Sequence, residues 1–380
     1  MIFVYIITLV LLAAYAVLLN YYLKGWKSQP ESGSPPSGYP ASTFITVLVP
    51  ARNEQQQIRN CLDSLLAQDY PKHLREFIII DDHSEDQTAA IVKEYENQGV
   101  RLLSLNEYLP AGQQNSYKKK AIETGISQSR GSLILTTDAD CTAGPGWLKA
   151  IAYCHEQTGA QLVAAPVKIP FQRTWLSVFQ SLDFLSLQGI TAASVFLGFH
   201  SMCNGANLAY TTHAFKAVKG FEGIDGLASG DDMLLMHKIA RDFPHQIVYL
   251  KNRDAIVNTL PTASLKDFLQ QRIRWASKAR FYDDKNVLVV LMLVYLLNIA
   301  LLVCMAAAFF SGNHALAAIG LILLKTLAEY RFMRSVAEFY GQSAIMQYFV
   351  FLQPFHIVYT VLAGTFGQFG QYEWKGRKVR

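Results

Sequence analysis

Residues 132–146 read SLILTTDADCTAGPG, and this stretch is the most informative one for the fold class. A short apolar run leads directly into Asp138, Ala139 and Asp140, and a Pro/Gly turn follows. An ionised carboxylate is expensive to bury without a partner, and two carboxylates one residue apart also repel each other. The pattern therefore predicts a buried strand whose end meets a positively charged group.

The segments around this stretch alternate between strand and helix patterns. Three more strands are predicted from the apolar, β-branched runs FITVLVP, EFIIIDD and VRLLSL. Helices are predicted between them from the spacing of apolar residues in NEQQQIRNCLDSLLAQ, DQTAAIVKEYEN and KKKAIETGISQS. This alternation predicts an α/β fold with a parallel sheet that is covered by helices on both faces.

Acidic residues stand at the carboxyl ends of these strands, where such sheets bind ligands. Asp81 and Asp82 end one strand, and Asp138 and Asp140 end another. Carboxylates prefer hard cations such as Mg²⁺ or Mn²⁺, which are often shared with phosphates. The alternative is that a strand-terminal acid caps the next helix. The chain has no P-loop and no G-x-G-x-x-G, so it offers no glycine cradle for phosphates.

The composition places the chain between soluble and membrane proteins, since it is 51% hydrophobic and 17% charged. Ile2–Leu23 contains no charged residue and is long enough to cross a bilayer as a helix. A cleaved signal peptide is the alternative, but the stretch lacks a positive leading region and a small-x-small site. Lys24 and Lys27 follow the stretch, which indicates a retained anchor whose C-terminal end faces the cytoplasm.

The C-terminal part is also apolar. Val287–Phe310 and Ile345–Phe366 are two candidate spans, and His314–Leu327, interrupted near its end by Lys325, is a weaker one. An anchor and three further spans would place the two basic ends of the chain on opposite sides of the membrane. Either one late segment is re-entrant or interfacial, or the basic tail breaks the positive-inside tendency.

These patterns divide the chain into five expected parts. They are an anchor at 1–23, a flexible Pro/Gly/Ser-rich linker at 24–42, an α/β domain at 43–285, a membrane region of two to three helices at 286–368 and a basic tail at 369–380. The five cysteines show no metal-binding spacing and fit a reduced compartment. The net charge of +5 fits a protein at a membrane surface, and we expect no nucleic-acid partner.

Five motifs occur in the order TVLVPARNE, IIIDDHSEDQT, TTDAD, SGDDMLL and QQRIRW. Together they resemble the conserved segments of glycosyltransferase family 2, which are inverting enzymes with the GT-A fold. The resemblance covers about residues 44–280, and the layout is similar to ceramide glucosyltransferase-like enzymes and bacterial membrane relatives. It implies a Rossmann-like mixed sheet covered by helices, transmembrane helices at both ends, a nucleotide-diphosphate sugar as donor and Mg²⁺ or Mn²⁺ as cofactor.

The resemblance also assigns the donor side of the site. It implies a nucleotide-binding set made of Pro50, Arg52, Glu54, Asp82, Lys118 and Asp138. Asp82 would accept a hydrogen bond from the base, commonly uracil. Asp140 would bind the metal directly, with Asp138 facing the ribose or the metal shell. For Lys118 a solvated helix start is the alternative interpretation.

The acid pair in SGDDMLL matches an E-D motif of the family, with Asp in place of Glu at the first position. By that register Asp232 is the general base and Asp231 its neighbour. The chemistry needs a base because an acceptor hydroxyl must lose its proton as it attacks the anomeric carbon. A helix N-cap is a compatible alternative for the same residues.

The QQRIRW motif supplies Gln271, Arg274 and Trp275, which the resemblance places at the diphosphate and the acceptor. An interfacial belt of Arg and Trp beside the following span is the alternative. Cys203–Tyr210 resembles an acceptor-side segment of the family. Phe171–Phe199 is apolar, and we expect either helices on the membrane surface or a buried core helix.

Three functions remain open from the sequence. The favoured one is transfer of a single sugar from a UDP-sugar to a hydroxyl of a membrane lipid. The second is a processive polysaccharide synthase of the cellulose or hyaluronan type, although at most three spans follow the domain. The third is a non-catalytic scaffold, which the retained acids disfavour: Asp82, Asp138, Asp140 and Asp232. We expect an integral protein of a bacterial inner membrane with its catalytic domain in the cytoplasm, and leave the oligomeric state open.

Overall fold

The protein is described from a computed structural model that covers residues 1–109, 117–199, 202–227, 230–278, 285–369, 372–374 and 377–379. The chain forms two compact units, each of which is described by itself. The helical unit consists of Met1–Ser28, Phe171–Ala193 and Pro261–Tyr372. The sheet unit consists of Gln29–Pro170, Ser194–Leu260 and Glu373–Arg380. Each unit is therefore assembled from separate stretches of the sequence.

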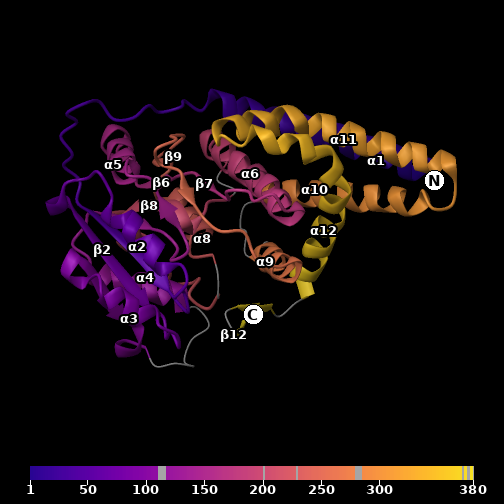
Figure 1. The fold of residues 1–380 in the computed structure, drawn as a ribbon. Coiled ribbons are helices and arrows are strands. Elements are labelled where there is room, and N and C mark those ends of the chain that lie inside the picture. Colours follow the sequence, from indigo (N-terminus) through magenta and orange to yellow (C-terminus); the bar gives the residue numbers. More distant parts are fainter. Residues whose placement is uncertain are drawn as a thin grey trace. The chain divides into compact units, whose positions relative to one another are not determined.

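A seven-stranded sheet forms the centre of the sheet unit, with the strand order β3-β2-β1-β4-β8-β6-β9 (Figure 1). The strands are β1 Ile45–Ala51, β2 Arg75–Asp81, β3 Val100–Ser104, β4 Leu133–Thr136, β6 Leu162–Ala164, β8 Leu208–Thr211 and β9 Ile247–Tyr249. The first four strands are parallel neighbours, whereas β8 runs antiparallel to both β4 and β6. The predicted α/β fold is confirmed. The sheet is mixed, as the family resemblance implied, and is not purely parallel.

Helices and a second, small sheet complete this unit. The helices are α2 Ile58–Leu66, α3 Thr88–Lys93, α4 Tyr117–Ser127, α5 Trp147–Thr158, α7 Thr212–Ala217 and α8 Met233–Asp242. The small sheet pairs β5 Thr142–Ala143, β10 Val257–Asn258 and β7 Val167–Lys168. Gly125 lets α4 approach the large sheet, because a Cβ there would lie 2.9 Å from a methyl carbon of Leu48 on β1. This close packing fixes where the first turn of α4 lies relative to the strand ends.

The segment predicted to be a flexible linker is attached to the sheet unit by hydrogen bonds. The backbone N–H of Ser32 donates to the carbonyl of Lys251 at 2.9 Å, and Asn252 donates to the carbonyl of Gly33 at 2.9 Å. Further along, Glu156 of α5 accepts hydrogen bonds from the backbone N–H groups of Ser42 and Thr43. The two ends of this segment are therefore held in place.

The helical unit contains α1 Ile2–Ser28, α6 Trp175–Phe196, α9 Leu265–Ser277, α10 Lys285–Ala307, α11 Gly312–Phe339 and α12 Phe349–Phe369. Within the described residues, three helical segments are long and apolar enough to cross a membrane: Ile2–Ser28, Lys285–Ala307 and Ser343–Gln368. The weaker span predicted around His314–Leu327 belongs to one continuous helix, α11. α1 continues through Lys24 and Lys27 to Ser28.

α6 is packed inside the helical unit. Phe179 joins a buried cluster with Phe268 of α9 and Tyr359 of α12. Gly189 lies so close to α11 that a Cβ there would be 2.5 Å from Val336. Of the two expectations for Phe171–Phe199, this packing supports the buried helix.

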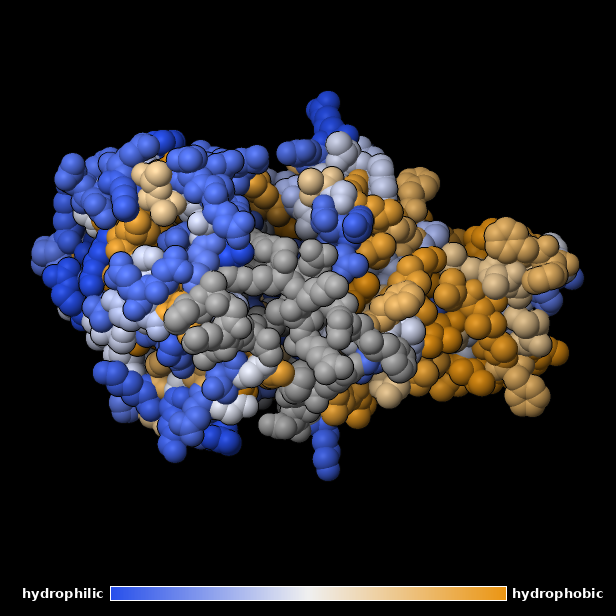
Figure 2. Space-filling view, turned by 90° about the horizontal axis from the view of Figure 1, so that it is seen from below, coloured by the Kyte–Doolittle hydropathy of each residue, from blue (hydrophilic) through white to orange (hydrophobic). Residues whose placement is uncertain are grey.

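The outer faces of α1, α10 and α11 carry hydrophobic side chains, and Figure 2 shows this part of the helical unit as a broad hydrophobic surface. On α11 these side chains include Leu316, Ile319, Leu323 and Leu327, each more than half exposed. Exposed apolar surface of this extent is typical of contact with lipid. The helices are thus suited to a membrane.

Candidate active site

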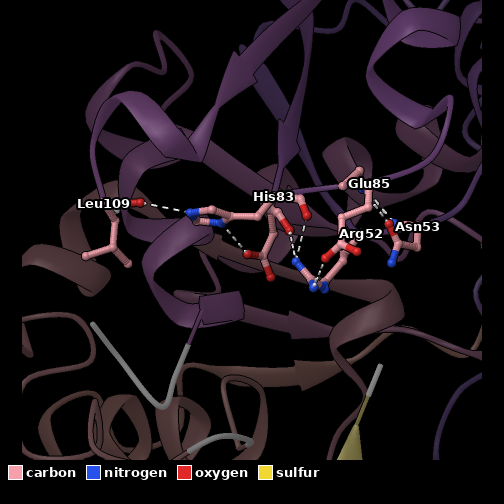
Figure 3. A network of polar contacts seen from close by, with 7 residues as sticks. Arg52, Asn53, His83, Glu85 and Leu109 are labelled. Atoms are coloured by element: carbon pink, nitrogen blue, oxygen red, sulfur yellow. Dashed lines mark hydrogen bonds and ion pairs between the residues drawn. The ribbon is translucent and has the colours of Figure 1, made fainter. Parts of the chain in front are cut away.

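Arg52 connects the loops that follow β1 and β2 (Figure 3). Its Nη1 donates to the backbone carbonyls of Asp82 at 2.9 Å and His83 at 2.7 Å. Its Nη2 forms an ion pair with Glu85 at 3.2 Å. Arg52 was predicted to lie against the nucleotide. In the structure its buried guanidinium holds together the two loops at this edge of the sheet.

Two residues in these loops have a left-handed backbone, although neither is glycine. Asn53 has a φ of 53° and His83 a φ of 55°. Asn53 is held by its side chain, whose Oδ1 accepts from the N–H of Glu85 at 2.8 Å, and by its own N–H, which donates to Ser84 Oγ at 3.0 Å. Such conformations cost free energy and occur often at functional sites.

Asp82 lies in a buried position at the end of β2. Its Oδ1 is 2.9 Å from Nδ1 of His83, and Nε2 of His83 is 2.9 Å from the carbonyl oxygen of Leu109 (Figure 3). His83 therefore orients the carboxylate that the resemblance assigns to the base of the nucleotide. Sequence reasoning passed over His83, although it directly follows the acid pair in DDHS.

Two further members of the predicted nucleotide set, Pro50 and Glu54, lie at the same edge. Pro50 pairs with Ile80 in the ladder between β1 and β2. The N–H of Glu54 donates to Thr88 Oγ1 at 2.7 Å, which ties the loop after β1 to the start of α3. These backbone contacts bring Pro50, Arg52, Glu54 and Asp82 to one edge of the sheet.

Lys118 supplies a positive charge at the strand end of TTDAD, where a divalent cation was predicted. It lies in the first turn of α4, and its Nζ is 2.7 Å from Asp138 and 3.3 Å from Asp231. Burial by itself would lower the pKa of Lys118, but the carboxylates of Asp138, Asp231 and Asp232 raise it above its ordinary value. Lys118 is therefore positively charged at neutral pH and connects the D-x-D motif to the second acid pair.

Asp138, Asp140 and Cys141 form a potential metal-binding group, since one ligand atom from each lies within 4.8 Å of the others. Burial raises the pKa of the Cys141 thiol well above its ordinary value, and the charges of Asp140 and Asp138 raise it further. The thiol is therefore protonated at neutral pH, and its Sγ donates to Asp140 Oδ1 at 3.4 Å. The two partly exposed carboxylates remain as oxygen ligands, which fit Mg²⁺ or Mn²⁺.

Asp232 caps α8, since its Oδ1 accepts from the N–H of Met233 at 2.7 Å. Its Oδ2 accepts from the N–H of Gly205 at 3.3 Å. A Cβ at Gly205 would lie 3.1 Å from Asp231 Oδ2, so this contact requires a glycine or a shift of the acid pair. The segment Cys203–Tyr210 thereby lies directly beside Asp231 and Asp232.

Gln271, Arg274 and Trp275 lie on α9 and belong to the helical unit. Arg272, which directly follows Gln271, is buried, and its guanidinium carbon lies 4.2 Å from the centre of the Trp275 ring. Sequence reasoning did not single out Arg272. The signal that could have found it is a second arginine within QQRIRW, one residue after Gln271.

Two family models match the chain. One, described as glycosyl transferase family 2, matches residues 46–215. The other, described as glycosyl transferase family group 2, matches residues 133–367, which include β4, α9 and the C-terminal helices.

Curated relatives agree with these models. Glycosyltransferase AglE of Haloferax volcanii is 32% identical over 145 residues, which are 38% of this chain and 46% of AglE. An N-acetylglucosaminyltransferase of Rhizobium meliloti is 27% identical over 288 residues, 72% of this chain and 65% of the relative. Dolichyl-phosphate beta-glucosyltransferase ALG5C of Trichomonas vaginalis is 33% identical over 129 residues, 32% of this chain and 37% of the relative. The chain spans less than two thirds of the length of each of these relatives.

A solved structure shares the fold. The mannosyltransferase PcManGT from Pyrobaculum calidifontis, in complex with GDP-Man and Mn²⁺, superposes with a TM-score of 0.59 at 21% identity. The superposition covers 93% of this chain and 99% of that one, and at this identity it supports the GT-A fold alone. Since the longer family match covers more than half of the chain, this protein belongs to the family 2 glycosyltransferases.

Proposed function

We propose that this protein is an inverting, metal-dependent glycosyltransferase that moves one sugar from a nucleotide-diphosphate sugar, with UDP-sugars as the favoured class, to a hydroxyl of a membrane lipid. The observation that carries the proposal is the position of Lys118 between Asp138 and Asp231. Lys118 connects the strand end that we expect to hold the donor with the acid pair that we expect to act on the acceptor. A donor and an acceptor must meet at one such place for transfer to occur.

Asp140 and Asp138 would hold the divalent cation through carboxylate oxygens. When bound, the cation would neutralise the charge of the diphosphate and of the nucleotide released as leaving group. The chain's own cation here, Lys118, stands beside Asp138 and can contact the same phosphate oxygens. The thiol of Cys141 donates to the carboxylate of Asp140 and so helps to orient it.

Asp232 takes the proton of the acceptor hydroxyl. The oxygen of the acceptor forms a bond to the anomeric carbon while the bond from that carbon to the diphosphate breaks. The configuration of the anomeric carbon is thereby inverted. The proton passes to the carboxylate of Asp232, and the nucleotide diphosphate leaves with the electron pair. The hydrogen bonds from Met233 and Gly205 orient this carboxylate, and Asp231 beside it is paired with Lys118.

A lipid acceptor fits the chemistry of the helical unit. Its exposed apolar side chains on α1, α10 and α11 suit it to a bilayer, and one curated relative is named as a dolichyl-phosphate glucosyltransferase. An acceptor that is itself a membrane lipid would bring its head group to an enzyme anchored in the same membrane. Product length distinguishes this function from a processive polysaccharide synthase.

For the membrane orientation we propose that α1, α10 and α11 cross the bilayer and that α12 lies along its cytoplasmic surface, although α12 is the more apolar of the last two helices; the exposed leucines of α11 favour its contact with lipid. Figure 1 shows α12 running across the direction that the other three helices share. Three crossings place the sheet unit, Lys24, Lys27 and the basic tail all in the cytoplasm, in line with the positive-inside tendency. An impermeant thiol reagent applied to intact cells should then fail to label a cysteine introduced at Glu107, and labelling there would reverse the orientation.

The transfer itself is tested with the full chain in lipid nanodiscs that contain native membrane lipids. Radiolabelled UDP- and GDP-sugars are supplied with Mn²⁺ or with a chelator, and lipid-extractable product is analysed by mass spectrometry. We expect one labelled sugar per lipid with a UDP-sugar and Mn²⁺, and none with the chelator. A polymeric product would establish the synthase instead, and absence of product with every donor would contradict the proposed function.

A further inference from the structure

Arg272 is an arginine inside a helix bundle, with only 4% of its side chain exposed. A buried guanidinium needs a partner, because an unpaired buried charge is strongly destabilising. The partner is Asp183 on α6, whose Oδ2 is 2.7 Å from Nε and 2.6 Å from Nη2 of Arg272. Asp183 is itself 2% exposed. Two helices that are distant in the sequence thus share one buried ion pair.

A third helix contributes to the same pair. The other carboxylate oxygen of Asp183 accepts a hydrogen bond from the hydroxyl of Tyr359 on α12. Around these groups lies an aromatic cluster that includes Phe179 and Phe268. Apolar surroundings of this kind keep water out and strengthen the electrostatic attraction. The orientation of the Arg272 guanidinium is therefore set by α6 and α12.

Arg272 passes this orientation on to two residues of its own helix. Its Nη1 donates to Oε1 of Gln271. Its guanidinium carbon lies 4.2 Å from the centre of the Trp275 ring, a distance that allows a cation–π contact. Since Oε1 of Gln271 already accepts from Arg272, the orientation of the amide is set, and its NH₂ group faces away from Arg272 and can donate to a ligand. The planar fork of arginine is needed for both contacts, which a lysine could not make together.

We propose that Asp183 and Tyr359 are positioning residues that orient Arg272 and, through it, the side chains of Gln271 and Trp275. This inference rests on the proposed function in one respect, since the use of Gln271 and Trp275 at the diphosphate and the acceptor belongs to that proposal. Asp183, Arg272 and Tyr359 are assigned no contact with the reacting atoms. Their role is to hold Gln271 and Trp275, the side chains that are proposed to contact the diphosphate and the acceptor.

The alternative is an ion pair that only joins three helices. Removing such a pair would lower the melting temperature and leave the environment of Trp275 in the folded protein unchanged. Tyr359→Phe is the informative variant, because it removes one hydroxyl, keeps the ring in the aromatic cluster and leaves Arg272 paired with Asp183. Tyr295→Phe is the matched control: Tyr295 of α10 also hydrogen-bonds to α12, through Thr365 at 2.7 Å.

The first measurement needs no substrate. The full chain, with its five tryptophans replaced by fluorotryptophan, is placed in nanodiscs, and the fluorine NMR line of Trp275 is assigned with Trp275→Phe. We expect Tyr359→Phe and Arg272→Lys to shift or broaden this line, with the larger change in Arg272→Lys. Tyr295→Phe should leave it in place. If Tyr359→Phe and Arg272→Lys give the same line as Tyr295→Phe, the positioning role is overturned.

The second measurement is kinetic and uses radiolabelled UDP-sugar with the lipids of the nanodisc as acceptor. We expect Tyr359→Phe to lower kcat about fivefold to tenfold, because the side chains of Gln271 and Trp275 lose their orientation toward the reacting groups. Tyr295→Phe should match the wild type. A kcat of Tyr359→Phe equal to that of Tyr295→Phe would contradict the positioning role. If the wild type forms no product, the proposed function fails, and the fluorine line still decides whether Asp183 and Tyr359 position Trp275.

Discussion

Two lysines that pair with acids show how differently the two units use charge. Lys118 of the sheet unit faces an excess of acids, since Asp138 and Asp231 contact it and Asp232 and Asp140 stand beside them. It is also partly open to solvent, with 20% of its side chain exposed. Lys325 of the helical unit is fully buried. It contacts one acid, Glu329 at 2.6 Å, and the amide oxygen of Gln353 at 2.7 Å.

The network around Lys325 is closed. Glu329 also accepts from Tyr15 of α1 and from the amide nitrogen of Gln353, each at 2.7 Å. One positive charge meets one negative charge, so α1, α11 and α12 can hold these groups away from water. The cluster around Lys118 carries unbalanced negative charge and is partly exposed to solvent. Of the two, the unbalanced and open arrangement is the one suited to bind ligands, and the balanced and closed one stabilises the fold.

The largest expected effect is that of Asp140→Asn. Removal of the charge from this proposed metal ligand should lower transfer roughly a thousandfold or more while the fold survives, because the amide is a poor ligand for a hard cation. Turnover is measured across a Mn²⁺ titration. Asp69→Asn is the matched control, since Asp69 is an exposed acid that pairs with Lys149 outside this cluster. Near-normal turnover of Asp140→Asn in the presence of a chelator would show that transfer needs no metal at Asp140.

Asp232→Asn should show whether Asp232 acts as the general base or takes part in binding the donor. Asparagine is as good an N-cap as aspartate, so α8 keeps its first turn and only the proton acceptor is lost. We expect kcat to fall by roughly a hundredfold to a thousandfold, with UDP and Mn²⁺ binding within about threefold of the wild type. Calorimetric titration checks the binding. A parallel loss of binding and turnover would show that Asp232 acts on the donor and not on the acceptor.

Two Lys→Met variants test the contrast between the lysines directly. Lys325→Met leaves Glu329 as a buried, uncompensated charge and should lower the free energy of unfolding by roughly 3 kcal/mol. Lys118→Met increases the excess of acids at the strand ends, and a divalent cation can compensate there. We therefore expect Mn²⁺ to restore the melting temperature of Lys118→Met and not that of Lys325→Met.

Thermal unfolding in nanodiscs, with and without Mn²⁺, provides the measurement. The wild type serves as the control for any general effect of the cation. If Mn²⁺ stabilises both variants equally, or neither of them, the distinction between an open and a closed charge cluster does not hold.

Glu156 provides a third case, a carboxylate held by neutral donors alone. It accepts from Tyr39, from Ser42 and from Thr43. Burial by itself would raise its pKa, but these hydrogen bonds lower it to about 2. A lowered pKa in the folded state means that the stabilisation is complete above the unfolded pKa and is lost as the pH falls toward the folded one.

We expect Glu156→Gln to lower the free energy of unfolding by about 1 kcal/mol at neutral pH, a value that allows for solvent screening. The difference from the wild type should shrink as the pH falls from about 5 toward about 2. Melting temperatures measured across this range test it. A difference that is constant with pH would mean that the carboxylate charge plays no part in holding the linker.

Much of the sheet unit was predictable because its signals are local. Apolar runs that end in acids placed β1, β2 and β4 and brought Asp82, Asp138 and Asp140 to one edge, since parallel strands share the direction of their carboxyl ends. The antiparallel β8 was not predictable in the same way. Its direction depends on the path of the chain through α6, and no residue of β8 signals that path.

The contacts that were missed are long-range. The place of Arg52 at the nucleotide stays a prediction, and its contacts with the carbonyls of Asp82 and His83 arise from the approach of two loops that are separate in the sequence. Asp183 and Arg272 lie 89 positions apart, and neither has an unusual local sequence. Hydrogen-bond partners of this kind are decided by distance in space, which a periodic pattern does not encode.

Neighbouring residues in the sequence were enough to predict the family, the strand ends that carry the acids and the helices apolar enough for a membrane. Which charges are balanced could be seen only in the folded chain, because the balance depends on residues that folding brings together. Lys118 and Lys325 both lie in helices, but Glu329 stands four residues after Lys325, whereas the acids that contact Lys118 are distant from it in the sequence. Folding brings two acid pairs to one lysine and a single glutamate to the other, and Coulomb attraction at these distances makes the first cluster a candidate site and the second a structural link.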